Sequence, residues 1–243
     1  MGARIEAVIF DFGGVLSTPP FVGLSEFERD NGYPKGSLLR LIFGDGPPTG
    51  AQRDAIAGGD ATAAAWAIYD AKDGQTPDWH LLETGRMTLA EFNQRLVARS
   101  ESHLGSPIDD RFYYRFLEAL RVDVYWPVVH RVRELRAAGY RTAILTNNVA
   151  EWAEVWMSTV PVDDFDVIID SSAVGLRKPE EAILLLTCER LGVAPEAAVF
   201  LDDSPGHVAA AQSAGLAGIV VSGPEQALAD LDALLGAGAS PRV

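Results

Sequence analysis

The chain has 243 residues with 20 Lys and Arg against 34 Asp and Glu, so its formal net charge is −14 at pH 7. This excess of negative charge argues against nucleic acid or an anionic membrane surface as a main partner, because both are polyanions. Hydrophobic residues make up 48% of the chain, which is typical of a folded globular protein, and the single cysteine, Cys188, excludes an internal disulfide and a multi-cysteine metal site.

The first predicted element is the apolar strand Ala7–Phe10, and the region from Ser17 to Asp123 that follows it has the pattern of helices rather than strands. The helices predicted there are Gly23–Asp30, Ser37–Phe43, Ala61–Tyr69, Thr88–Ser100 and Asp109–Leu120. Thr88 and Glu91 have the spacing of a capping box at the start of one of them. The sequence therefore predicts that residues 17–123 form an α-helical cap domain inserted after the first strand.

Four more apolar runs follow the insertion and predict strands that are buried on both faces, as in a parallel sheet. They are Thr142–Leu145, Val167–Ile169, Ala198–Leu201 and Gly218–Val221. Helices are predicted over Val128–Ala138, Glu180–Leu191 and Pro205–Ala214, each followed by a glycine that can end a helix. Residues 1–16 and 124–236 are thus predicted to form a doubly wound α/β, Rossmann-like core, and residues 237–243 a flexible tail.

Apolar runs in this sequence fall short of the roughly 20 residues that a membrane-spanning helix needs. The first ten residues, MGARIEAVIF, also lack the layout of a signal peptide. We therefore expect no membrane partner and a cytoplasmic location. No sequence pattern indicates the oligomeric state.

Polar side chains follow four of the predicted strands. In chain order they are Asp11 before Gly13 and Gly14, Thr146 before Asn147 and Asn148, Asp170 followed later by Arg177 and Lys178, and the pair Asp202 and Asp203. Because the carboxyl ends of parallel strands meet at one edge of a sheet, we expect these groups to converge, and ligands bind at that edge in open α/β sheets.

Three carboxylates at one edge repel each other unless water or a hard cation relieves the repulsion. Mg²⁺ fits this need, because it prefers oxygen ligands and keeps several waters. A lysine and a hydroxyl beside such an ion can hold phosphate oxygens, and an aspartate in contact with a phosphoryl group can act as a nucleophile. The residues alone therefore predict metal-assisted phosphoryl transfer on a small phosphorylated molecule.

Four motifs in this order resemble those of the haloacid dehalogenase-like hydrolase superfamily. They are VIFDFGGVL, ILTNN, GLRKPE and FLDDSPG, and they span residues 8 to 206. The inserted helical stretch resembles the cap of subfamily I members. The branch that this chain resembles contains the N-terminal phosphatase domain of soluble epoxide hydrolase and bacterial sugar-phosphate phosphatases.

The resemblance implies a Mg²⁺-dependent phosphatase that works through a phospho-aspartate at Asp11. The catalytic residues that it implies are Asp11, Thr146 and Lys178. The phosphate-binding residues that it implies are Gly13, Gly14, Thr146, the amide of Asn147, and Lys178. The metal ligands that it implies are Asp11, the backbone carbonyl of Gly13, Asp203 directly, and Asp202 directly or through water.

One position departs from the family pattern. Phosphatases of this family usually carry a second Asp two residues after the nucleophile, where it protonates the leaving group, and this chain has Gly13. Such acid–base help is worth about 10²–10⁴-fold in rate. Either the substrate has a good leaving group, or another residue supplies the proton, or turnover is poor.

Three functions therefore remain open: the phosphatase, a weak or inactive relative that binds a ligand or partner, and a metal-free 2-haloacid dehalogenase, which also lacks the second Asp. The acidic pair Asp202 and Asp203 argues against the dehalogenase. His207, one turn into the helix after that pair, is predicted to be a surface or packing residue rather than to replace the missing acid.

Overall fold

The structure, a computed structural model, describes residues 4–19, 23–43, 77–119 and 122–238. The chain divides into two compact units, one formed by residues 1–18 and 123–243 and the other by residues 19–122. The first unit holds all the strands named below, and the second unit is helical over its described residues.

A five-stranded parallel sheet forms the centre of the first unit, with the strand order β3-β2-β1-β4-β5. Its strands are β1 (Ala7–Phe10), β2 (Arg141–Thr146), β3 (Val167–Asp170), β4 (Ala198–Asp202) and β5 (Ala217–Val220). This arrangement confirms the predicted doubly wound, Rossmann-like α/β class. Three strands run one residue further than predicted, so that their polar ends, Thr146, Asp170 and Asp202, belong to the sheet itself.

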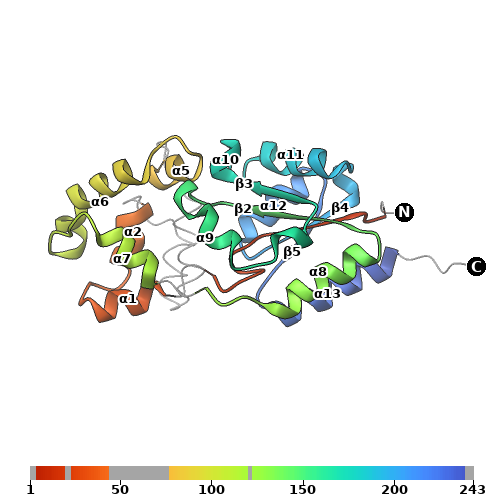
Figure 1. Ribbon diagram of the computed structural model, residues 1–243, viewed down its shortest axis with the longest axis horizontal. Helices are drawn as coiled ribbons and strands as arrows, with labels where there is room; N and C mark the ends of the chain where they lie inside the picture. Colours follow the sequence, from red (N-terminus) through yellow and green to blue (C-terminus); the bar gives the residue numbers. More distant parts are fainter. Residues whose placement is uncertain (1–3, 20–22, 44–76, 120–121, 239–243) are drawn as a thin grey trace, which may run out of the picture. The chain divides into compact units, whose positions relative to one another are not determined.

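Helices cover both faces of the sheet (Figure 1). One face carries α8 (Trp126–Ala137) and α13 (Pro224–Gly238), and the other carries α11 (Glu181–Leu191) and α12 (Pro205–Ser213). Helix α13 was not among the predicted helices, and it continues two residues past the predicted end of the core at 236. Two short helices that the sequence did not indicate, α9 (Ala153–Met157) and α10 (Ser171–Val174), follow β2 and β3.

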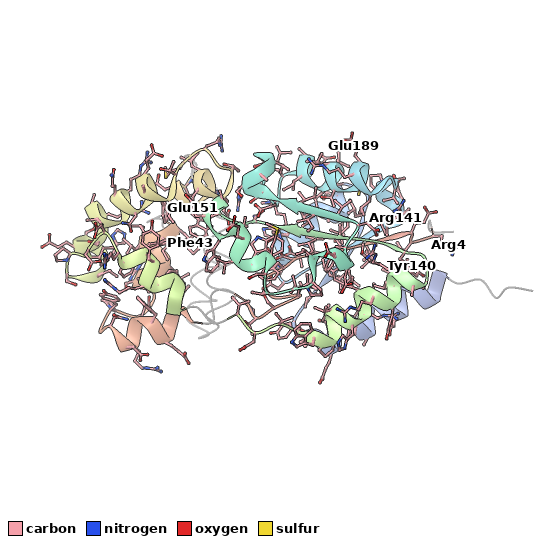
Figure 2. All side chains as sticks on the ribbon, viewed as in Figure 1. Arg4, Phe43, Tyr140, Arg141, Glu151 and Glu189 are labelled. Atoms are coloured by element: carbon pink, nitrogen blue, oxygen red, sulfur yellow. The ribbon has the colours of Figure 1, made fainter. Side chains whose placement is uncertain are left out.

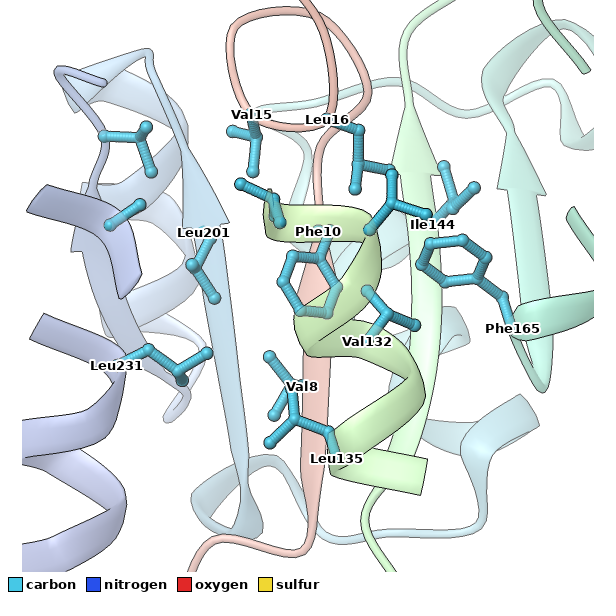
Figure 3. Close-up of a cluster of buried hydrophobic side chains, with 14 of the residues drawn as sticks. Val8, Phe10, Val15, Leu16, Val132, Leu135, Ile144, Phe165, Leu201 and Leu231 are labelled. Atoms are coloured by element: carbon cyan, nitrogen blue, oxygen red, sulfur yellow. The ribbon is translucent and has the colours of Figure 1, made fainter. Parts of the chain in front are cut away.

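The core has two layers because alternate residues of a strand point to opposite faces of the sheet. Val8 and Phe10 of β1 pack in the layer under α8, against residues such as Val132 (Figure 3), whereas Ala7 and Ile9 pack in the layer under α11. Every residue of β1 is fully buried, as the continuous apolar run predicted.

The two edges of the sheet differ in character. Tyr140 and Arg141 mark the edge where β2 begins, and Figure 2 labels both there. Arg141 is exposed and lies 3.8 Å from Asp166, an ordinary surface ion pair. The opposite edge, where the strands end, carries the buried polar groups described below.

The helical unit is held by its own aromatic core. Its described helices are α1 (Leu24–Asp30), α2 (Ser37–Phe43), α5 (Asp78–Glu83), α6 (Leu89–Leu104) and α7 (Phe112–Ala119). Trp79 of α5 packs edge-on against Phe43 and Phe92. The capping box of Thr88 and Glu91 is confirmed at the start of α6, α5 was not predicted, and the predicted helix Ala61–Tyr69 lies outside the described residues.

Across the described ranges, we find no helix that combines the length and the apolar composition of a membrane span.

Candidate active site

Three aspartates meet where the strand order of the sheet reverses. Asp11 follows β1, Asp202 ends the neighbouring β4, and Asp203 comes next in the chain. The Asp11 N–H donates to the carbonyl of Leu201 at 2.9 Å, which ties the end of β1 to β4. One carboxylate oxygen from each aspartate lies within 4.8 Å of the others, so the three are close enough to share an ion. This point of an open α/β sheet is where ligands bind.

Lys178 joins two of these carboxylates from the loop before α11. Its Nζ lies 2.8 Å from Asp11 Oδ1 and 2.7 Å from Asp202 Oδ2, and the side chain is only 1% exposed. Asn147, just after β2, fixes the Lys178 backbone with two hydrogen bonds, accepting from its N–H at 2.8 Å and donating to its carbonyl at 3.0 Å. The Asn147 side chain therefore holds the backbone of Lys178 in place, and phosphate binding at this position stays a prediction.

The two neighbouring aspartates, Asp202 and Asp203, differ in their hydrogen bonding. Asp202 is fully buried and accepts from Lys178 and from the Ser204 N–H at 2.8 Å, and His207 Nδ1 lies 3.1 Å from each of its oxygens. Neither oxygen of Asp203 has a hydrogen-bond partner, although both are shielded from solvent. Buried polar atoms are normally bonded, so the Asp203 carboxylate is the one whose surroundings point to a ligand.

Gly14 makes room for that carboxylate. Its φ is +83°, a conformation that only glycine adopts readily, and a Cβ built on it would lie 2.2 Å from Asp203 Oδ2. The Gly14 N–H donates to the Ser17 carbonyl at 2.8 Å, and Gly13 forms an isolated bridge with Ser17. The glycine pair thus folds the loop tightly around the acidic group, and phosphate binding by Gly13 or Gly14 stays a prediction.

Burial and mutual repulsion change the acidity of the three carboxyls in the absence of an ion. Burial raises the pKa of Asp203 to about 8, and the charges of Asp202 and Asp11 add to this. Burial likewise raises the pKa of Asp11 to about 7 against the attraction of Lys178. Burial acts in the same direction on Asp202, but His207 and Lys178 outweigh it and hold the pKa of Asp202 well below its usual range.

The lysine stays charged in this setting. Burial disfavours its ammonium form, but the carboxylates of Asp11 and Asp202 outweigh burial and raise the pKa of Lys178. Three carboxylates against one ammonium leave an excess of two negative charges when all are ionised. An all-oxygen donor set with that charge and with an unbonded carboxylate fits a hard divalent cation such as Mg²⁺.

Another buried carboxylate, Asp170, holds together the loops around the site. It accepts from Asn148 Nδ2 at 2.8 Å and from Trp156 Nε1 at 3.2 Å, and it caps α10 through the Ser172 N–H at 3.0 Å. Trp156 in turn packs on Phe12, next to Asp11, with ring centroids 5.0 Å apart. The sequence showed Asn148 and Asp170 at strand ends, but nothing in it indicated that they pair with each other and with Trp156.

His207 contacts a charged group of the site, which packing alone does not require. The ring is 1% exposed and its Nδ1 contacts Asp202, whereas the sequence indicated only that it lies one turn into a helix. Thr146 is buried at the end of β2, the strand beside β1. The predicted residues from all four strand ends are therefore brought to one edge of the sheet.

The family model for haloacid dehalogenase-like hydrolases matches residues 5–215 of this chain. Among curated proteins, the chain is 32% identical to acyl-CoA dehydrogenase family member 10 of Mus musculus, covering 97% of this chain and 20% of that protein. It is 24% identical to bifunctional epoxide hydrolase 2 of Sus scrofa, over 96% of this chain and 39% of that protein. The chain thus spans between 20% and 39% of the length of these two relatives.

Shorter relatives and solved structures are also similar. A phosphoglycolate phosphatase of Nitrosococcus oceani is 30% identical over half of this chain and 59% of its own length. A predicted HAD-like family hydrolase from Porphyromonas gingivalis has a TM-score of 0.62 at 22% identity, covering 96% of this chain and 98% of its own. A HAD family enzyme from Bacteroides thetaiotaomicron, crystallised with magnesium and inorganic phosphate, has a TM-score of 0.59 at 18% identity, covering 92% and 98%. At these identities, the structures show a shared fold.

Proposed function

Because the chain belongs to the haloacid dehalogenase-like hydrolase family, we propose that it is a Mg²⁺-dependent phosphatase that acts on a small phosphorylated metabolite through a phospho-aspartate at Asp11. The observation that carries this proposal is the arrangement of Asp11 between a buried ammonium group and the unbonded carboxylate of Asp203. The similarity to a phosphoglycolate phosphatase supports the same reaction class.

The nucleophile is held by one oxygen only. Asp11 Oδ1 accepts from the Phe12 N–H at 2.6 Å and from Lys178 Nζ at 2.8 Å. Among the described residues, none donates to Oδ2, which leaves that oxygen to form the bond to phosphorus while the bond from phosphorus to the leaving group breaks. Water then attacks the phospho-aspartate and releases inorganic phosphate and the free carboxylate of Asp11.

Positive charge at this point makes the attack on a phosphate dianion feasible. Lys178 can contact a phosphoryl oxygen while it holds Asp11, and the Thr146 hydroxyl and the Asn147 backbone N–H are proposed to bind the others. A Mg²⁺ ion held by Asp11, Asp203 and the Gly13 carbonyl would supply the remaining charge neutralisation. We assign Asp202 to holding Lys178 rather than to a direct metal bond, since each of its two oxygens is already engaged by donors of the protein.

Turnover of p-nitrophenyl phosphate and a panel of small phosphate esters tests the proposal. We expect hydrolysis that needs Mg²⁺, that a chelator stops, and that Asp11→Asn reduces to background. The control Asp163→Asn removes a charge from an exposed acidic residue and should leave the rate unchanged. A wild type as inert as Asp11→Asn in the presence of Mg²⁺ would contradict the proposal.

Gly13 favours a second candidate, a relative that binds a ligand or partner with little turnover. Gly13→Asp separates the two candidates, because a restored acid should raise the rate on unactivated esters by about 10²-fold or more if the remaining groups are competent. No gain, together with no binding of Mg²⁺, would favour the binding protein.

The third candidate, a 2-haloacid dehalogenase, has less support because it needs no cation beside Asp203. Release of chloride from 2-chloropropionate in the presence of a chelator would establish it.

A further inference from the structure

We propose that His207 is a positioning residue for the proposed phosphatase reaction, and that it acts through Asp202 to keep Lys178 against the nucleophile. The inference rests on the proposed function. The described side-chain contacts of His207 are with Asp202, so we assign it a positioning role and not a catalytic one.

The local structure aims the imidazole at Asp202. His207 lies in the first turn of α12, where its N–H donates to the Ser204 hydroxyl at 3.3 Å, and Ser204 caps the helix. Because α12 begins directly after the acidic pair, its first turn lies beside the end of β4. The His207 Nδ1 faces both oxygens of Asp202 at 3.1 Å.

The direction of this hydrogen bond follows from the other partners of Asp202. The carboxylate already accepts from the Lys178 ammonium and from a backbone N–H, so it is ionised and can only accept. The proton between the two side chains therefore belongs to Nδ1 of His207. A leucine would fill the same buried space but would leave the carboxylate without this donor.

The contacts continue in an unbroken series to the nucleophile. Asp202 Oδ2 holds Lys178 Nζ at 2.7 Å, and the same Nζ holds Asp11 Oδ1 at 2.8 Å. Without the His207 donor, the Asp202 carboxylate is held by one contact at each oxygen and can rotate about its terminal torsion. Lys178 then loses its fixed position, and displacements of about 1 Å at reacting groups can cost about 10²-fold in rate.

Three variants test this role in the full-length protein. His207→Leu removes the donor, His207→Asn keeps a donor near the position of Nδ1, and Val208→Ala creates a defect at a neighbouring buried residue of the same helix. We expect kcat for p-nitrophenyl phosphate to fall about 10–100-fold in His207→Leu, with a much smaller change in KM. His207→Asn should recover most of this loss, and Val208→Ala should lower the melting temperature without lowering kcat.

The outcomes separate this inference from the proposed function. A wild type without turnover overturns both. An active wild type in which His207→Leu loses no more rate than Val208→Ala, or in which His207→Asn is as impaired as His207→Leu, overturns the positioning role alone.

If His207→Leu does not fold, long-range ¹H–¹⁵N spectra of the wild-type histidines decide. The His207 ring must carry its proton on Nδ1 at neutral pH, and that signal must shift in Asp202→Asn. An Nδ1 without a proton overturns the inference.

Discussion

Removal of the Asp203 carboxylate should make the metal-free protein more stable. The pKa of Asp203 is raised to about 8 in the folded protein, first by burial and then by the charges of Asp202 and Asp11. An aspartate in the unfolded chain titrates near about 3.9. Between these two values the folded state holds a proton that the unfolded state releases, so the stability of the wild type falls as the pH rises from about 4 to about 8.

The size of the effect follows from this gap. The pH of 7 lies roughly three units above the unfolded pKa, and each unit is worth about 1.4 kcal/mol. The gain in the free energy of unfolding therefore has an upper limit of about 4 kcal/mol. Solvent relaxation around this half-buried group reduces the gain to about 2–4 kcal/mol, which corresponds to a rise in melting temperature of roughly 4–16 °C. Truncation of Asp203 to Ala leaves no donor unsatisfied, because neither of its oxygens accepts a hydrogen bond.

Thermal unfolding of wild type and Asp203→Ala in chelator, from pH 4.5 to 8, measures the gain. The difference in melting temperature should be smallest at pH 4.5, close to the unfolded-state pKa, and should grow with pH to its largest value at pH 8. Saturating Mg²⁺ should raise the melting temperature of the wild type and not that of the variant. The control Asp163→Ala removes the same charge from the exposed surface. A variant that is less stable than wild type at pH 8, or that responds equally to Mg²⁺, would refute the reasoning.

Three further predictions follow from the same geometry. Gly14→Ala should cost about 3 kcal/mol or more, because it adds a strained φ and a steric clash with Asp203. The control Gly192→Ala changes a glycine with a similar φ of +72° but with open space around it, and it should cost only about 1–2 kcal/mol in urea unfolding. Equal losses of stability in the two variants would contradict a steric clash between position 14 and Asp203. Asp170→Ala leaves the donors of Asn148 and Trp156 unsatisfied and should cost about 2–4 kcal/mol, with a parallel loss of activity, whereas retained stability would show that this brace is dispensable. The affinity for Mg²⁺, measured by calorimetry, should fall as the pH drops below about 7, because protons compete for Asp11 and Asp203, whose pKa values are about 7 and about 8. An affinity that is independent of pH between 6 and 8 would exclude these carboxyls as the ligands.

The sequence by itself was sufficient for the α/β class and for the edge at which the polar groups meet. Continuous apolar runs suit strands that are buried on both faces, as in a parallel sheet, and parallel strands all end on the same side, so Asp11, Thr146 and Asp202 were expected to lie near each other. The start of helix α6 was also predictable, because the capping box of Thr88 and Glu91 is a local sequence signal. The short helices α5, α9 and α10 were not, because helices of four to six residues carry too little periodicity and depend on tertiary packing.

Only the tertiary structure distinguished the two members of the acidic pair. In sequence, Asp202 and Asp203 are chemically identical neighbours, but successive residues at a strand end point to opposite faces. Asp202 points with Phe200 toward the side where Lys178 and His207 bind it, and Asp203 points toward the space left by Gly14. The number of donors that surround each carboxylate depends on residues far away in the chain, which is why one aspartate holds the lysine and the other is left to bind a cation.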